Sequence, residues 1–178
     1  MARFSLHAVG KDRPGIIAGV AAALARMGAN LEDSRMTILR GQFAVMLVLD
    51  APGISDGGLI EGALEPVAEE LNLFIAVRPL PDGTSAPDTG ERFSVLVDGA
   101  DRPGIVAGIA ESILSLGGNV TELSSRLLEH EGHSGYVLRL IVSVPSGVSG
   151  KQLEEVVVAA SQKLGVNASV TQGAGEFE

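Results

Sequence analysis

The start of the chain changes from the apolar pattern of a strand to that of a helix. Residues 4–9 form a short run of strand-forming types, and after a polar segment apolar residues recur every three or four positions. We expect the helix to begin at Pro14, whose fixed φ suits a first turn, with Asp12 just upstream as its cap. Gly28 follows the last apolar residue of this pattern and is expected to end the helix.

The rest of the first half predicts three more strands and a second helix. The expected elements, in chain order, are a strand at 31–39, a strand at 43–49, a helix at 55–71 and a strand at 73–77. Ser55 is placed to cap the helix. Pro66 lies inside the helical pattern, so it is expected to kink the helix or to make it begin afresh.

The second half predicts the same order of elements. They are expected at 92–98, 103–116, 120–128, 136–144, 149–164 and 166–171, with Ser149 capping the second helix. A polar segment, Glu129–Gly135, is expected to join the two middle strands by a longer connection than in the first half. Each half therefore predicts a β-α-β-β-α-β order. With right-handed crossovers, this order gives an α+β, ferredoxin-like fold: a four-stranded antiparallel sheet with two helices on one face.

The two halves are also related in sequence. Residues 4–31 align without a gap with residues 93–120, at an offset of 89, and 13 of the 28 paired positions are identical. A period of this length is typical of a small domain and too long for a solenoid repeat. Because Pro, Gly, Asp, Ser and Thr dominate 79–90, we expect a linker there. The expected organisation is a first domain at 1–78, the linker at 79–90, a second domain at 91–172 and a disordered tail at 173–178.

Composition and charge exclude several classes of function. The formal net charge is −9 and only 3% of the residues are aromatic. Binding to duplex DNA draws on Lys and Arg against phosphates, and single strands stack on aromatic rings, so we expect no direct contact with nucleic acid. The chain has no Cys, which excludes disulfides, thiolate metal sites and a cysteine nucleophile.

The chain shows no signal for a membrane, a metal or catalysis. No apolar run approaches the roughly 18 residues of a membrane span, and Met1 is followed by a strand-like segment, not a signal peptide, so we expect a cytoplasmic protein. His130 and His133 are close in sequence but have no evident third metal ligand. Since no arrangement of a nucleophile with a base is visible, we expect no enzyme activity, no metal and no cofactor.

The loop that is repeated in both halves is the best candidate for binding. Gly15 and Gly104 are expected in a first helical turn, where they leave room for close approach, and Gly10 and Gly99 are expected to adopt unusual backbone conformations. Backbone amides at a helix N-terminus suit a carboxylate, and Asp12 or Asp101 would suit an ammonium group. This combination fits an α-amino acid, although a purely architectural loop fits as well. The amides belong to Gly15, Ile16 and Ile17, and to Gly104, Ile105 and Val106.

An asparagine follows the helix-ending glycine in each half. Asn30 and Asn119 occupy matching positions two residues after Gly28 and Gly117. Asparagine is common in turns and caps, and its amide can also donate to and accept from a ligand held between two domains. Both interpretations remain open for these two residues.

A strand, the segment Asp-Arg-Pro-Gly-Ile, a helix that ends at Gly and a following Asn together resemble the ACT domain. The resemblance covers both halves, and the tandem arrangement resembles regulators of the glycine cleavage system repressor type. It implies domains that pair side by side and bind an amino acid between one domain's first loop and helix and its neighbour. The matching positions are Asp12, Gly15, Ile16 and Asn30 in the first half and Asp101, Gly104, Ile105 and Asn119 in the second.

The resemblance also implies a mode of action. Such regulators act through a protein partner and do not touch DNA, which agrees with the acidic charge. We therefore expect a non-enzymatic regulatory protein for a small amino acid such as glycine, acting in amino-acid or one-carbon metabolism or its transcriptional control, and a homodimer is compatible with this. The alternatives are a ligand-free protein-interaction module and a detached regulatory subunit of an amino-acid enzyme.

Overall fold

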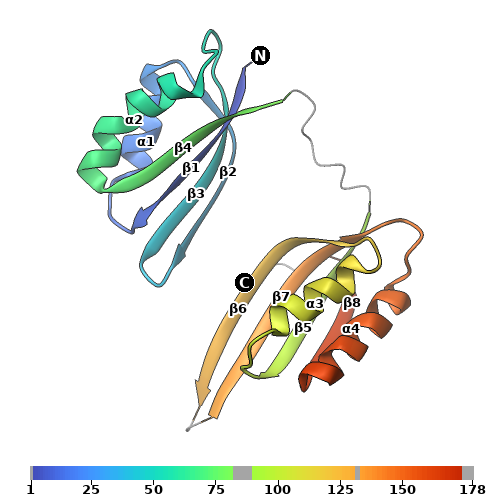
Figure 1. The fold of residues 1–178 in the computed structure, drawn as a ribbon. Helices are drawn as coiled ribbons and strands as arrows, with labels where there is room; N and C mark the ends of the chain where they lie inside the picture. The colour runs from blue at the N-terminus through green and yellow to red at the C-terminus, as the bar shows by residue number, and fades with distance from the viewer. Residues whose placement is uncertain (1, 82–89, 131–132, 174–178) are drawn as a thin grey trace. The chain divides into compact units, whose positions relative to one another are not determined.

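The computed structural model describes residues 2–81, 90–130 and 133–173. The chain divides into two compact units, unit 1 at residues 1–85 and unit 2 at residues 86–178 (Figure 1). Residues 82–89 of the predicted linker and residues 174–178 of the predicted tail lie outside the described ranges.

Unit 1 has the predicted β-α-β-β-α-β order. Its sheet is antiparallel, with the strand order β2-β3-β1-β4, and both helices cover one face of it (Figure 1). The elements are β1 (Arg3–Lys11), α1 (Ile16–Arg26), β2 (Asn30–Leu39), β3 (Gln42–Asp50), α2 (Gly57–Leu71) and β4 (Leu73–Leu80).

Unit 2 repeats this architecture. Its antiparallel sheet has the order β6-β7-β5-β8, which is the same topology as in unit 1. The elements are β5 (Glu91–Ala100), α3 (Ile105–Leu114), β6 (Asn119–His130), β7 (His133–Val144), α4 (Gly150–Leu164) and β8 (Val166–Gln172). The ferredoxin-like fold predicted for each half is confirmed.

Each core lies between the sheet and the two helices of its unit. Alternate residues of the central strands point at the helices, so apolar side chains from strand and helix meet in one layer. The largest fully buried side chains include Phe4, Leu6, Leu24, Leu49, Ile60 and Leu64 in unit 1 and Ile105, Ile109, Ile113, Leu138 and Leu140 in unit 2. None of the described helices is long and apolar enough to span a bilayer.

One prediction about the second helix of unit 1 is wrong, and one of the two alternatives predicted at Pro66, a fresh start of the helix, is excluded. Its cap is Asp56, whose side chain accepts a hydrogen bond from the N–H of Gly58 (3.0 Å), and not Ser55. The helix also runs through Pro66 as one element and does not begin afresh there. In unit 2, by contrast, Ser149 caps α4 as predicted, in a capping box with Gln152.

The longer hairpin of unit 2 differs from the prediction. Its strands β6 and β7 continue through the segment that was expected to be a loop, and they pair as far as His130 and His133. Hairpin strands of this kind can take polar residues because one or both faces of an edge strand meet water. The described part of the connection is therefore strand, and its two central residues lie outside the described ranges.

Candidate functional site

The repeated loop ends in a glycine that precedes the helix in both units. Gly15 and Gly104 are the N-caps of α1 and α3, with φ of 96° and 94°, in the left-handed region. The helices accordingly begin at Ile16 and Ile105, so Pro14, Pro103 and the two glycines lie before the first turn and not within it. Only glycine adopts this conformation without steric cost, which explains its repetition at both positions.

The helix N-termini are uncapped and open. Neither α1 nor α3 has a side-chain cap, so the predicted capping by Asp12 is wrong. The first helical hydrogen bond of α1 joins the N–H of Gly19 to the oxygen of Gly15 (2.8 Å). The N–H groups of Ile16 and Ile17 precede this bond and have no acceptor within the helix. A Cβ built on Gly15 or Gly104 would meet nothing within 4 Å. Gly15 and Ile17 are exposed whereas Ile16 is only 2% exposed, so the amides of Gly15 and Ile17 are the ones open to a ligand from outside.

The glycines at the end of the first strands serve a different purpose. A Cβ on Gly10 would lie 2.9 Å from the backbone oxygen of Asn72, and one on Gly99 would lie 2.8 Å from Cγ1 of Val166. The sequence prediction attributed these glycines to unusual backbone conformations. At Gly10 the requirement is instead the close approach of β4, since its φ lies outside the left-handed region.

The candidate asparagines lie at the far end of the sheet from the repeated loop. Asn30 opens β2 and pairs with Asp50, whereas the loop follows Lys11, which pairs with Gln42 at the other end. The 11 residues of α1 separate the two ends by about 16 Å at 1.5 Å per residue. One unit therefore does not bring Asn30 to the loop. Both asparagines are exposed first residues of strands, not caps.

A bulge in each edge strand changes which side chains face the helices. The register of β2 shifts between Leu31 and Asp33, and that of β6 shifts at the same repeat position, between Val120 and Glu122. Because the extra residue, Glu32 in unit 1, reverses the alternation, Leu31 and Ser34 point to the same face of the sheet. Arg3 forms an ion pair with Glu32 (Nε to Oε2, 2.9 Å).

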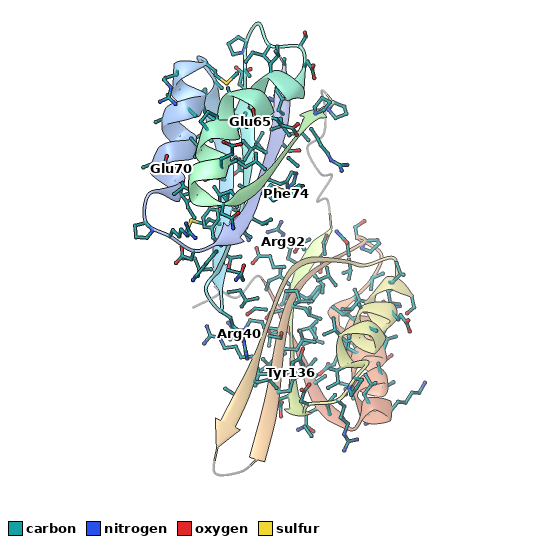
Figure 2. All side chains as sticks on the ribbon, turned by 60° about the vertical axis from the view of Figure 1, so that its left-hand side comes forward. Arg40, Glu65, Glu70, Phe74, Arg92 and Tyr136 are labelled. Carbon is teal, nitrogen blue, oxygen red and sulfur yellow. The ribbon has the colours of Figure 1, made fainter. Side chains whose placement is uncertain are left out.

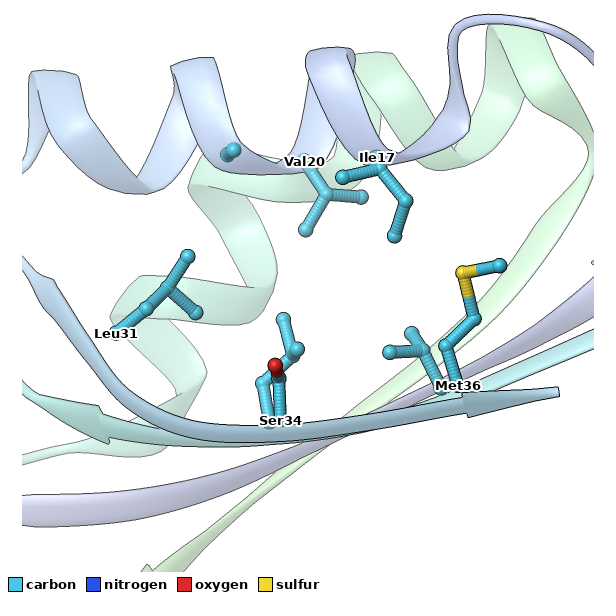
Figure 3. Close-up of a pocket in the computed structure, with 8 residues that line it drawn as sticks. Ile17, Val20, Leu31, Ser34 and Met36 are labelled. Atoms are coloured by element: carbon cyan, nitrogen blue, oxygen red, sulfur yellow. The ribbon is translucent and has the colours of Figure 1, made fainter. Parts of the chain in front are cut away.

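This rearrangement leaves an apolar pocket between α1 and β2. In Figure 3 the side chains of Ile17 and Val20 point from α1 toward β2, where Leu31, Ser34 and Met36 lie. The pocket has a volume of about 210 Å³, and Ala21, Val45 and Leu47 complete its lining. Every residue of β2 is exposed, because the helices cover the other strands and stop short of this edge. Among the pocket residues only Ile17 was a predicted site residue. The alternation of Met36 and Ile38 with Arg35 and Thr37 was a signal for that part of the strand, but it does not include Leu31, which the bulge brings to the same face.

The equivalent surface of unit 2 has the same frame with different side chains. Val106 replaces Ile17, and Leu123 and Ser125 replace Ser34 and Met36, as the paired registers of β6 and β7 show. Unit 2 thus has a large side chain where unit 1 has the small Ser34, and a small one where unit 1 has the large Met36. The two candidate sites are therefore not equivalent, which agrees with the difference in hairpin length.

Within the described ranges, no three His, Asp or Glu side chains are grouped closely enough to share a metal ion. The site therefore consists of backbone amides, exposed carboxylates and an apolar pocket. It can hold an anionic group and a small apolar group side by side.

A sequence model of the ACT domain matches residues 3–78. A UPF0237 protein of Methanopyrus kandleri is 39% identical over 80 residues, which are 44% of this chain and 88% of that protein. The chain belongs to the ACT domain family.

The glycine cleavage system transcriptional repressor of Escherichia coli is 26% identical over 167 residues, covering 93% of this chain and 87% of the repressor. A crystal structure of an unknown protein from Galdieria sulphuraria has a TM-score of 0.81 and 26% identity, with 97% and 99% of the two chains covered. The tandem ACT arrangement is therefore shared over nearly the whole chain.

Proposed function

We propose that this chain is a non-enzymatic, cytoplasmic regulatory protein that binds a small amino acid at the edges of its ACT domains. The observation that carries the proposal is the pair of open, uncapped helix N-termini at Gly15 and Gly104. Amides at such a terminus favour a carboxylate. Glycine is the first amino acid to test, because the relative in Escherichia coli is named for the glycine cleavage system.

The ligand would require a neighbouring domain. The loop of Asp12 and the position of Asn30 lie at opposite ends of one sheet edge. A neighbour that lies antiparallel along this edge presents its own asparagine to the loop and would close the open side of the pocket. Binding would then favour the paired arrangement of domains over the unpaired one, and such differential affinity is what a sensor requires.

A protein partner would convert this change into a response. The net charge of −9 disfavours direct binding to DNA, so control of transcription would pass through another protein. A second candidate function, a ligand-free interaction module or regulatory subunit, is favoured by one observation. The ten residues of β2 are all exposed, and an exposed edge strand is a template for pairing with another chain.

The test is a thermal-shift screen of the full chain against the twenty amino acids, followed by calorimetry on any ligand found. A ligand at 100 times its dissociation constant stabilises the native state by about 2.7 kcal/mol, which gives a clear shift. Selective shifts with one or two amino acids support the sensor. A flat screen with co-purification of a protein partner would support the interaction module instead.

Asp12→Asn and Asp101→Asn are the informative variants for the site. Both carboxylates are exposed and hold no helix cap, so their loss should weaken binding of the ammonium group while the melting temperature stays unchanged. Glu65→Gln, in the middle of α2 and labelled in Figure 2, is the matched control because it removes an exposed charge that does not belong to the loop. Equal affinity in all three variants would remove the carboxylates from the site.

A further inference from the structure

The face of the unit 1 sheet that points away from the helices carries an exposed apolar cluster. Phe74 on β4 is 68% exposed, Met46 on β3 is 49% exposed and Val9 on β1 is 45% exposed. These residues alternate with core residues along their strands, and Val9 pairs directly with Phe74. Figure 2 shows Phe74 on β4, apart from the helix residues Glu65 and Glu70. We call this side of the sheet the outer face.

Unit 2 carries polar side chains at the same positions of the same fold. Asp98 occupies the position of Val9, Asn167 that of Phe74 and Arg139 that of Met46, according to the strand registers. The amide of Asn167 donates a hydrogen bond to Asp98 (3.0 Å). The fold therefore does not require apolar residues at these three positions, although Leu96, at the position of His7, is a 36% exposed leucine on the same face of unit 2. An exposed apolar cluster such as that of Val9, Met46 and Phe74 is typical of an interaction surface.

The charges at the rim of this face are complementary to those of a second copy. Asp33 on β2 and Arg78 on β4 lie in one row across the sheet, joined by the pairs through Val48 and Ser5. Three strand spacings, about 14 Å, separate the two side chains, so they do not pair within one unit. A two-fold axis parallel to the strands lays β2 of one copy over β4 of the other. Each row of residues across the sheet then lies opposite the same row of the second copy, in reverse order. Asp33 therefore lies opposite the second copy's Arg78.

The same axis matches large side chains with small ones. In the row of Thr37, Ala44, Val9 and Phe74, reversal places Phe74 opposite the second copy's Thr37 and Val9 opposite its Ala44. Sheets that stack face to face keep their strands within about 30° of each other, which this axis satisfies. Alternating large and small residues allow the two layers to interdigitate.

The area is sufficient for a reversible dimer. Four strands about 4.8 Å apart and about 26 Å long present roughly 500 Å² on each copy. Two such faces bury about 1,000 Å², at the lower end of specific interfaces. We propose that the outer face of unit 1 is a self-association surface that pairs two chains face to face about a two-fold axis parallel to its strands. This pairing does not depend on the amino-acid ligand or on the β2 edge.

The first test is sedimentation velocity of the full chain over a wide range of concentration, with Val9→Asp/Phe74→Asn as the variant. This double variant transplants the Asp98–Asn167 pair of unit 2 into the same register, so the sheet has a precedent for it. We expect a concentration-dependent dimer in the wild type and its loss in the variant. Leu114→Asn, which alters a 69% exposed leucine on α3, is the matched control and should leave the dimer intact.

Charge exchange tests the geometry independently of apolar packing. Asp33→Arg and Arg78→Asp should each weaken the dimer about tenfold, because each places like charges opposite one another. A mixture of the two variants restores both pairs and should form a heterodimer about as tight as the wild type. A wild type that is monomeric throughout, a dimer that survives Val9→Asp/Phe74→Asn, or a mixture that does not associate would each overturn the proposal.

Discussion

The backbone N–H of Asp12 donates a hydrogen bond to the backbone oxygen of Gly41 (2.9 Å). This bond joins the first repeated loop to the tip of the β2–β3 hairpin, so the turn at the tip helps to position the candidate site. Arg40 and Gly41 form that turn with φ of 50° and 76°. Two consecutive left-handed residues between paired strands define a type I′ turn.

Arg40→Asn should stabilise unit 1. Arginine pays a steric cost in the left-handed region that asparagine largely avoids, so we expect a gain of about 0.5–1 kcal/mol in the free energy of unfolding. Urea unfolding followed by circular dichroism measures it. Tyr136, the only tyrosine of a chain without tryptophan, reports unit 2 separately by fluorescence and should not change. A lower midpoint for Arg40→Asn would contradict this account of the turn.

Gly15→Ala and Gly104→Ala should each destabilise their unit by about 1–2 kcal/mol, although a Cβ would touch nothing. The cost comes from φ alone, and it makes a glycine-to-leucine substitution here unsuitable as a binding test that retains the fold. The tyrosine signal of Tyr136 should shift only with Gly104→Ala.

Gly62→Ala is the control for that pair. Gly62 also has open space around it, but it lies inside α2 with ordinary helical φ, so alanine should stabilise the helix by about 0.5–1 kcal/mol. Changes of opposite sign in the free energy of unfolding for Gly15→Ala and Gly62→Ala would establish backbone conformation as the cause. Changes of the same sign would refute it.

The order of elements was predictable because each rests on local periodicity. The strands extend beyond their predicted ends by at most three residues except in the unit 2 hairpin, and the repeat located the loop of Gly15 and Gly104. The bulge was not predictable, since Glu32 and Thr121 look like ordinary polar residues of a strand. The pocket was missed for a related reason. Its existence depends on where the helices stop short of the β2 edge, which is a property of packing and not of the local pattern.

Ser149→Ala should lower the stability of unit 2 by about 1 kcal/mol. The Ser149 hydroxyl accepts from the N–H of Gln152 (3.3 Å), and the Gln152 side chain accepts from the N–H of Ser149 (2.9 Å). The substitution therefore leaves the N–H of Gln152 without its partner. Ser149→Thr keeps the hydroxyl and should retain most of the stability. Urea unfolding followed by Tyr136 fluorescence measures both variants, and equal losses would mean that the capping box contributes nothing.

Ser34→Leu should fill the pocket between α1 and β2. Leu123 occupies the matching position of unit 2, so the strand accommodates leucine there, and the volume of about 210 Å³ gives the side chain room. Partial burial of the added apolar surface should raise the stability of unit 1 by about 0.5–1 kcal/mol. Ser34→Ala removes the hydroxyl without filling the space, so it is the matched control and should change stability little.

Ser34→Leu also tests whether a bound amino acid uses the pocket or only the N-terminus of α1. If the side chain of a bound amino acid lies in the pocket, Ser34→Leu abolishes binding at unit 1, while unit 2 keeps its own site with Val106 and Leu123. Calorimetry would then show fewer sites per chain with unchanged affinity at those that remain. Unchanged stoichiometry in Ser34→Leu, together with weaker binding in Asp12→Asn, would place the ligand wholly on the loop and leave the pocket to a neighbouring protein surface.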